Sequence, residues 1–442
     1  MATPMGAAGT HGAGAGNSYR GALSLLASLF FMWGFITVIN GTLLPHLRSV
    51  FNLTYLQTTL IESVWFIAYF FASIPSAKLI ERIGYQRSLV TGLLIMAAGA
   101  LGMILAASIP SYGVTLVMLF VIASGITLLQ VAANPYVAVI GPAETSSSRL
   151  NLVQAFNSLG TMLAPAFGAY LILGRSVSGT VKSGVAVTPA ERLADAHSVM
   201  LPYLLVTVVL VGLAVVISRF PLPAIGAANS RAARVHDPRP LGVRVRQHQL
   251  WQHRNLVWGI PAMIAYLLAE IGVANLFVNF VSQPHIADLT QEQAGHYLTL
   301  LWGGMMVGRF VGALTMQRFA AERILALFAV GAVAVVVGAI VLSGPAAMWS
   351  LILVGLFHSI MFPTIFTLAI RGLGPLTEDG SGLMIMAIAG GALVFVQGIL
   401  ADRYGVQMSF VLTAACDLAV LAYAVWGSRP THALPDQTVV AA

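Results

Sequence analysis

The segment Leu128–Pro142, LLQVAANPYVAVIGP, is followed after five residues by Ser148–Pro165, SRLNLVQAFNSLGTMLAP. In both segments, carboxamide side chains stand inside runs of apolar residues. A soluble protein would hardly produce either segment. An amide exposed to lipid is costly, so a membrane helix of this kind should turn its amides toward a cavity or another helix. The two segments therefore indicate neighbouring helices of a membrane-embedded bundle.

The composition of the whole chain agrees with a lipid environment. Of 442 residues, 58% are hydrophobic and only 8% are charged, with a mean hydropathy of +0.86. This is too few polar side chains to cover a water-soluble surface. Transmembrane helices also tolerate the 43 glycines and 20 prolines, because small residues allow close helix packing.

Twelve apolar runs are long enough to be helices that cross a bilayer, which takes roughly 20 residues. We therefore predict an all-α membrane protein with twelve transmembrane helices in two pseudo-symmetric six-helix halves. The runs begin near Gly21, Tyr55, Ser88, Gly113, Leu150, Ser198, Leu256, Gly295, Arg323, Ala347, Ser381 and Val406.

The longest polar interruption, from about Pro221 to Arg254, separates six runs from six. The first twenty residues are rich in Gly and Ala and lack the apolar core of a signal peptide, so we expect a flexible tail. The predicted organisation is a tail over 1–20, a first six-helix bundle over 21–220, a cytoplasmic linker over 221–254, a second bundle over 255–428 and a C-terminal tail over 429–442.

The net charge of +7 reflects the membrane topology of the chain and does not indicate nucleic-acid binding. Basic residues gather in alternate loops, which predicts that both termini are cytoplasmic. The single cysteine, Cys416, excludes a disulfide framework and a cysteine-based metal site. No catalytic or phosphate-binding motif is present, so we expect neither an enzyme nor a cofactor.

The two halves repeat each other weakly. SAKLIERIGYQR at Ser76–Arg87 corresponds in position to GRFVGALTMQRFAAER at Gly308–Arg323, since each joins the second and third runs of its half. Two repeated halves predict a binding site between them near the middle of the membrane, and transport by rocking of one half against the other.

Four stretches resemble the fucose–galactose–glucose symporter family of the major facilitator superfamily. They are the two segments quoted above, WGFITVINGTLLPHL from Trp33 and FPTIFTLAIRGLG from Phe362. The likeness covers nearly the whole chain. It implies a twelve-helix carrier in the bacterial cytoplasmic membrane that takes up a neutral hexose or deoxyhexose, or in related branches an amino sugar, usually with a proton.

A sugar presents hydroxyls that each donate and accept, so its pocket needs amides and carboxylates. Asn151, Gln154 and Asn157 recur every third residue and share one helix face. The alternative role for such amides is interhelical hydrogen bonding, and Asn134, before Pro135, could cap a broken span. The predicted sugar-binding residues are Asn40, Gln130, Asn134, Gln154, Asn157, Glu270, Asn275 and Asn279.

Glu270 lies deep in an apolar run, where a carboxylate is functional by default. We assign it to a sugar hydroxyl; the alternative is a structural pair with a basic residue. We expect His358 to be a hydrogen-bonded packing residue. Arg309 and Asp417 are expected to be structural, and Arg309, toward the inner end of its span, could reach the membrane surface.

The chain departs from the family pattern at the carboxylates. Glucose and galactose members carry an aspartate where Gly41 stands, and fucose members carry acids near Val38 and at Gln130. Glu62 in the second run is our candidate for the missing coupling carboxylate; the alternative is a boundary residue paired with Arg48. A coupling carboxylate would need a pKa raised by desolvation.

The expected partners are thus a monosaccharide, a coupling proton and the lipid bilayer, with no nucleic acid and a monomeric carrier. Sodium coupling, an uncoupled uniporter and an exporter of drugs or metabolites on the same fold remain open. The amides Gln130, Gln154 and Asn157 speak against an exporter, whose pocket is usually more apolar.

Overall fold

The computed structural model describes residues 21–37, 55–108, 111–168, 200–220, 222 and 249–430. Within these ranges every regular element is helical, and the helices form twelve consecutive rods. Those of the first half are Gly21–Thr37, α2 (Tyr55–Ile83), α3 (Tyr85–Ser108), α4 (Tyr112–Val139), α5 (Ser146–Gly168) and α7 (Met200–Arg219).

The second half contains the other six rods, three of which are composite. They are α10 (Arg254–Val281), α11 (Gln291–Thr315), α12 (Ala321–Val341), α13 with α14 (Gly344–His358, Met361–Ile370), α15 with η5 and α16 (Thr377–Met386, Ala387–Val394, Phe395–Tyr404), and α17 (Val406–Ala422) with a short π-helix (Tyr423–Gly427). This arrangement confirms the predicted twelve-helix fold.

Most of these rods suit a bilayer. Ten helical stretches of the described ranges are long and apolar enough to cross a membrane. The shorter helix Gly21–Thr37 and the amide-rich α5 complete the set of twelve. Large apolar side chains such as Phe71, Leu314 and Val341 point away from the protein, as expected for a surface that faces lipid.

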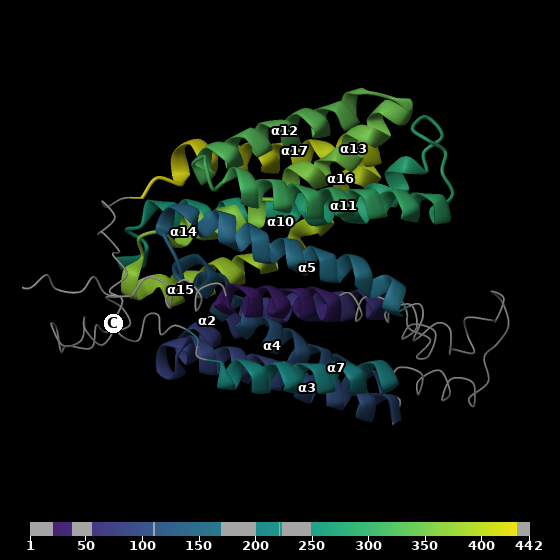
Figure 1. Ribbon diagram of the computed structural model, residues 1–442. Coiled ribbons are helices and arrows are strands. Elements are labelled where there is room, and N and C mark those ends of the chain that lie inside the picture. Colours follow the sequence, from purple (N-terminus) through teal and green to yellow (C-terminus); the bar gives the residue numbers. More distant parts are fainter. Residues whose placement is uncertain are drawn as a thin grey trace, which may run out of the picture.

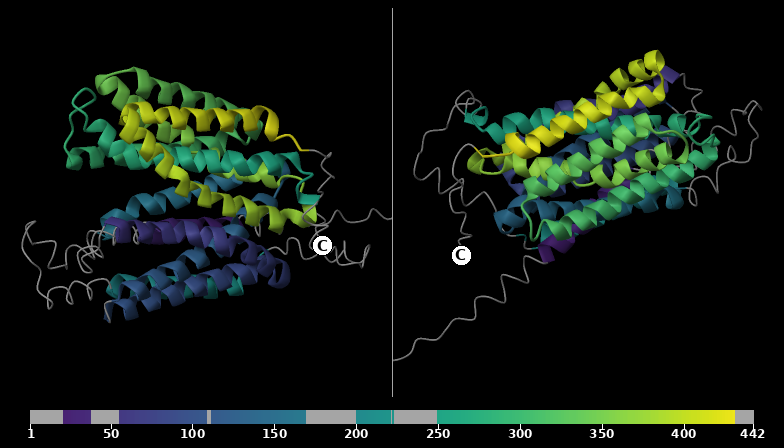
Figure 2. Two further views of the ribbon diagram at one scale, coloured as in Figure 1. Left: turned by 180° about the vertical axis from the view of Figure 1, so that it is seen from behind. Right: turned by 90° about the horizontal axis from the view of Figure 1, so that it is seen from above.

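The two halves lie as two layers of nearly parallel helices (Figures 1 and 2). In Figure 1 the helices α10–α13, α16 and α17 form the upper layer, whereas α2, α3, α4 and α7 form the lower one. The helix α5 lies where the layers meet and packs against both α11 and α14. On the other side of the seam, α15 packs against α2 and α4.

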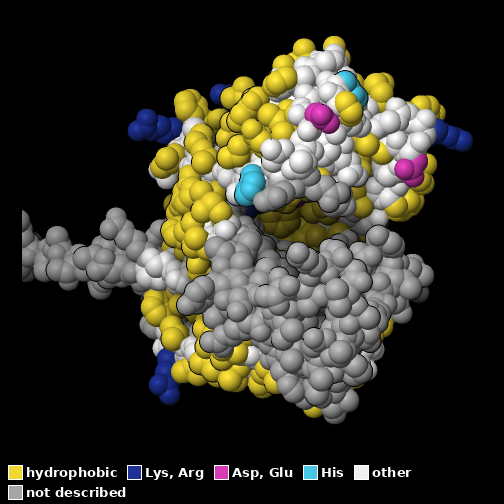
Figure 3. Space-filling view, turned by 90° about the vertical axis from the view of Figure 1, so that its right-hand side faces the viewer, with side chains coloured by type: hydrophobic (Ala, Val, Ile, Leu, Met, Phe, Trp, Pro, Cys, Tyr) yellow, Lys and Arg dark blue, Asp and Glu magenta, His cyan; other side chains and the backbone are white. Residues whose placement is uncertain are grey.

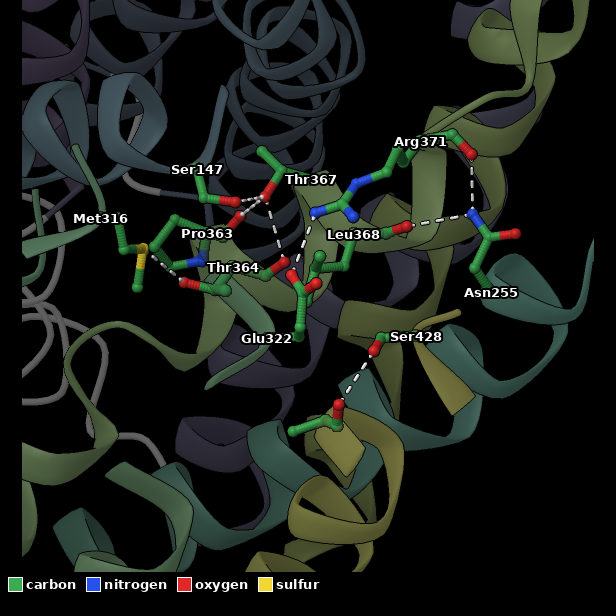
Figure 4. A network of polar contacts seen from close by, with 11 residues as sticks. Ser147, Asn255, Met316, Glu322, Pro363, Thr364, Thr367, Leu368, Arg371 and Ser428 are labelled. Carbon is green, nitrogen blue, oxygen red and sulfur yellow. Dashed lines mark hydrogen bonds and ion pairs between the residues drawn. The ribbon is translucent and has the colours of Figure 1, made fainter. Parts of the chain in front are cut away.

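Several hydrogen bonds between described residues join the halves at one end, which we call the linker end, where α7 ends and α10 begins. Here the Ser147 hydroxyl lies 2.6 Å from that of Thr367, and Ser148 donates to the Ala313 carbonyl at 2.6 Å. The Tyr85 hydroxyl donates to Glu378 at 3.1 Å. Figure 4 shows the Ser147–Thr367 contact and its surroundings. At the opposite, far end, Figure 3 shows a hollow in the surface.

Prolines in the fourth rod of each half free backbone carbonyls for contacts between helices. A proline has no N–H to donate to the carbonyl four residues earlier. For Pro135 that carbonyl is Val131, which instead accepts a hydrogen bond from Ser381 of α15 at 3.0 Å. The helix α4 continues through Pro135 to Val139, so the expectation that Asn134 caps a broken span is wrong.

The interruption lies in the tenth rod instead. Two turn residues, Ser359 and Ile360, separate α13 from α14. Pro363 cannot donate to the carbonyl of Ser359, and Arg309 of α11 donates to it through Nε at 3.1 Å. Discontinuous spans, whose unwound backbone carbonyls bind groups outside their own helix, are typical of transporter binding sites.

Candidate functional site

Three amides of the first half are placed by helix packing. Gln130 on α4 is buried and donates to the Tyr69 hydroxyl of α2 at 2.6 Å. Asn157 on α5 donates to the carbonyl of Phe30 at 2.9 Å. Asn151, also on α5, donates to the Thr364 hydroxyl of α14 at 3.2 Å, across the seam between the halves. All three therefore hold helices together in this structure.

The first helix and α5 approach unusually closely. A side-chain carbon at Gly34 would overlap the carbonyl oxygen of Asn157, and one at Gly160 would overlap the carbonyl oxygen of Phe31. Only glycine permits this backbone contact, and the contact fixes the position of Asn157. Its bond to Phe30 favours the interhelical role that the sequence left open for this residue.

Other amide atoms of α4 and α5 are buried and have no hydrogen-bond partner among the described residues. These atoms are Nε2 of Gln154, both side-chain polar atoms of Asn134, and Oδ1 of Asn151. Leaving a buried donor or acceptor unsatisfied costs about 1–3 kcal/mol. Such atoms in a carrier are the groups that a solute hydroxyl or a water molecule would satisfy.

The second half supplies the carboxylate. Glu270 lies half-buried in the middle of α10, and it interacts electrostatically with the hydroxyl of Tyr266, one turn earlier. That hydroxyl is buried and makes no hydrogen bond of ordinary geometry within the described residues. Asn275 and Asn279 lie farther along α10 with exposed side chains.

Arg309 connects the amides of the first half to Tyr266 and Glu270 of the second half. Its guanidinium group donates to the carbonyl of Gln154 at 3.3 Å and to the hydroxyl of Ser158. It also interacts electrostatically with Tyr266. The side chain is 9% exposed, so the prediction that it reaches toward the membrane surface is wrong. The guanidinium instead joins Gln154 of one half to the surroundings of Glu270 in the other.

Two further titratable side chains, His358 and Asp417, form a pair beside Tyr266. The Nε2 atom of His358 is 2.9 Å from Oδ1 of Asp417, and the two side chains are 2% and 0% exposed. The ring of Tyr266 meets the His358 ring edge-on, with centroids 6.0 Å apart. Sequence reasoning did not connect these residues, although two ionisable side chains in apolar runs were a signal that they pair.

Two of the predicted residues cannot be placed against this geometry. Asn40 lies outside the described residues, and Glu62 belongs to α2 but its side chain lies outside them as well. The structure brings together Gln154 and Glu270 through Arg309. It holds Gln130 against α2 and Asn157 against the first helix.

The chain has two six-helix layers, and the seam between them contains buried amides and one carboxylate. Comparison with known proteins shows which family has these features. The model of the Major Facilitator Superfamily matches residues 25–376. The chain belongs to the major facilitator superfamily. A glucose/galactose transporter of Brucella abortus is 42% identical over 413 residues, which covers 93% of this chain and 95% of that protein.

Solved structures of another member of the superfamily agree in fold. The fucose:proton symporter FucP of Escherichia coli superposes with a TM-score of 0.84 at 31% identity, and 93% of this chain and 100% of that chain are covered. A second structure, of FucP in the outward conformation, gives a TM-score of 0.80 with the same coverage. These similarities confirm membership of the fucose–galactose–glucose symporter family within the superfamily.

Proposed function

We propose that this carrier imports a neutral monosaccharide of the hexose or deoxyhexose class together with a proton. The observation that supports this most directly is the unpartnered Nε2 atom of Gln154. It is held between the halves because Arg309 binds the carbonyl of the same residue. Gln154 and Asn134 offer donors and acceptors, and Glu270 offers a charged acceptor, which together match the paired hydroxyls of a sugar.

We assign the remaining candidates by their surroundings. Gln130 orients Tyr69, whose ring and hydroxyl can meet a sugar face and edge. Asn157 holds the first helix beside α5 through its hydrogen bond to the Phe30 carbonyl. Asn275 and Asn279 are exposed on α10 toward the far end, where they can meet the sugar as it enters.

The distribution of charge supports a membrane orientation. Within the described residues, every lysine and arginine except Arg309 and Arg403 lies at the linker end. Cytoplasmic segments of membrane proteins are enriched in these residues. The linker end and both termini would then be cytoplasmic, in a bacterial inner membrane, and the carrier a monomer.

In that orientation, the structure corresponds to a state that loads from outside. The hydrogen bonds across the linker end, such as Ser147 to Thr367, close the cytoplasmic side, and the hollow lies at the far end. Rocking of the halves would break these contacts and open the same site to the cytoplasm.

The coupling proton has two candidate carriers. One is Glu62 on α2, which stands in place of the acid missing from the first helix. The other is the set of buried charged residues of the second half. Both lie in membrane-spanning helices, where an ionisable group must be neutralised or paired.

The test is uptake of labelled glucose, galactose, fucose, mannose and N-acetylglucosamine by the full-length protein in proteoliposomes. Inward proton and sodium gradients are imposed separately. Accumulation of one sugar under the proton gradient alone supports the proposal. Accumulation under sodium alone makes the carrier a sodium symporter, and equilibration without accumulation makes it a uniporter. Failure to transport any of the five sugars would contradict the sugar assignment.

A further inference from the structure

The pair formed by His358 and Asp417 occupies an unusual position. His358 is the last residue of α13, immediately before the interruption in the tenth rod. The carbonyl groups at the C-terminal end of a helix carry a partial negative charge that favours a protonated histidine. Asp417 faces it from the middle of α17 at 2.9 Å. Both side chains are almost wholly buried, at a depth where charge is expensive.

This pair is poorly explained as a device for stability. Apolar residues of similar size would usually stabilise a buried position as well or better. The second carboxylate oxygen of Asp417, Oδ2, is buried and has no hydrogen-bond partner among the described residues. An ionised carboxylate can accept hydrogen bonds on both oxygens, and within the described residues His358 satisfies only one oxygen of Asp417.

The charged groups around the His358–Asp417 pair come from two neighbouring helices. The elements packed against the pair bring Glu270 from α10 and Arg309 from α11, and Glu270 interacts electrostatically with His358. Cys416, the neighbour of Asp417, packs against Leu268 and Ala269. Apart from Tyr266, the other charged or titratable residues of these elements and of α12 and α16 lie toward helix ends: Arg254, Glu292, His296, Tyr297, Glu322, Arg323, Asp402, Arg403 and Tyr404.

Two carboxylates and one guanidinium give this cluster a net charge of minus one when His358 is neutral. One additional proton makes the cluster neutral. A medium of low dielectric strongly favours the neutral form. The buried cluster is therefore arranged to hold one proton while it is shielded from water, and to lose it when water reaches the charges.

We propose that the His358–Asp417 pair carries the coupled proton, which rests on the proposed function of sugar–proton symport. At the far end an O–H bond of hydronium breaks and its proton adds to the unprotonated ring nitrogen of His358, forming an N–H bond, so that an imidazolium faces the Asp417 carboxylate. When the linker end opens, the same N–H bond breaks and the proton returns to cytoplasmic water. Tyr266 lies between the pair and Glu270. Glu270 is more exposed than Arg309, His358 and Asp417.

The same geometry links the proton to the sugar. A sugar bound at Glu270 displaces water from the only member of the cluster that water readily reaches. Removal of water strengthens the preference of the cluster for its neutral, protonated form. Sugar and proton then load together, because each makes the binding of the other more favourable.

The test uses the full-length protein in proteoliposomes with the sugar found in the uptake assay. A gradient of about one pH unit supports about tenfold accumulation when one proton accompanies one sugar. We expect Asp417→Asn and His358→Gln each to abolish this tenfold accumulation. Sugar exchange at equal pH should fall by less than about threefold, because exchange needs only the loaded carrier to rock.

Proton movement gives an independent measurement. Addition of sugar to vesicles in weak buffer should make the outside medium alkaline for the parent protein and not for either variant. Asp417→Glu retains a carboxylate and should recover part of both signals. Cys416→Ala, at the adjacent buried position, is the matched control and should leave accumulation and alkalinisation as in the parent.

Two results would overturn the proposal. Accumulation and alkalinisation at parental levels in Asp417→Asn would make the pair structural. Loss of exchange together with accumulation, in variants that remain monodisperse, would assign the pair to helix packing. If the parent protein exchanges sugar but never accumulates it under a proton gradient, the proposed symport itself fails, and that failure is visible before any variant is compared.

Discussion

The fourth rods of the two halves each contain a proline, and the two halves use it differently. Pro135 leaves α4 continuous, and the carbonyl that it frees at Val131 accepts a neutral hydroxyl from Ser381. Pro363 follows the interruption between α13 and α14, and the carbonyl that it frees at Ser359 accepts a hydrogen bond from the guanidinium group of Arg309. One proline therefore supports a neutral contact, and the other supports a charged one.

The same contrast extends through the interior of the halves. Among the described side chains, the first half contributes the buried amides Gln130, Asn134 and Gln154, and its buried Arg149 lies near the start of α5. The second half contributes the charged cluster of Glu270, Arg309, His358 and Asp417. Amides suit recognition of a neutral solute, and ionisable groups suit proton binding. The comparison suggests that recognition and energetic coupling are concentrated in different halves.

Removal of Arg309 should have the largest effect, because this residue joins the halves. Arg309→Ala removes the guanidinium group that donates to the carbonyls of Ser359 and Gln154, and it leaves two carboxylates without a counter-charge. Breaking a buried charge arrangement in this way costs about 3–5 kcal/mol. We expect sugar exchange to fall by about 100-fold or more, measured as counterflow in proteoliposomes.

The controls for Arg309 separate charge from geometry. Arg309→Lys keeps the charge but loses the planar fork, so it should fall between the parent and the alanine variant. Arg318→Ala, in the loop after α11, should behave as the parent does. Exchange within about threefold of the parent in a folded Arg309→Ala variant would contradict the central role of this residue.

Gln154→Ala tests the neutral half of the comparison. Its Nε2 atom has no hydrogen-bond partner among the residues that the structure describes, so truncation should leave the fold intact and weaken sugar binding. Loss of a hydrogen bond to a buried hydroxyl costs about 1–3 kcal/mol, or roughly 5- to 150-fold in affinity. Equilibrium binding by isothermal titration calorimetry measures the change.

A neighbouring position provides the control for Gln154. The hydroxyl of Thr161 binds the Ser158 carbonyl within α5 at 2.7 Å, so Thr161→Val should change sugar affinity little. If Gln154→Ala binds sugar as tightly as the parent, the amide serves helix packing, and recognition must lie elsewhere.

Ser381→Ala tests the neutral contact at the linker end and should have a smaller effect. It removes the donor to the Val131 carbonyl, at a cost of about 0.5–1.5 kcal/mol. The far-end-open population should fall by roughly 2- to 10-fold relative to the other state. Spin labels at Ser111 and Gln293, both near the far end, would report this as a shift in the double electron–electron resonance distance distribution.

The reverse result is also informative for Ser381. An unchanged distance distribution would mean that Ser147, Ser148 and Tyr85 hold the linker end without it. Ser218→Ala, whose hydroxyl bonds only within α7, is the control for general effects of removing a helix serine.

The number and approximate bounds of the helices were predictable, because the hydropathy of a segment is a property of its own residues and needs no knowledge of its neighbours. Two predicted starts, Tyr55 and Val406, coincide with the first residues of α2 and α17. The interruption before α14 could also have been anticipated from Pro363, which removes a hydrogen bond from any continuous helix. Hydropathy alone merges α13 and α14 into one span.

Side-chain partners were harder to predict because they join helices far apart in the chain. Gln154 and Glu270 were identified from their residue types, but Arg309, which lies 155 residues from its partner Gln154, was expected at the membrane surface. The sequence showed that His358 and Asp417 lie in apolar runs. It did not show that two helices bring them to 2.9 Å.

The smallest effect is expected at Glu62, where the two candidate carriers of the proton make opposite predictions. If the His358–Asp417 pair binds the proton, Glu62→Gln should accumulate sugar within about twofold of the parent, since the amide preserves size and polarity while the titrating pair is untouched. If Glu62 is the coupling group, the same variant should exchange sugar but lose accumulation. Gly41→Asp in that background should then restore part of it, because the family places an acid there. Comparison of Glu62→Gln with Asp417→Asn under one proton gradient therefore decides which half of the carrier couples the proton to the sugar.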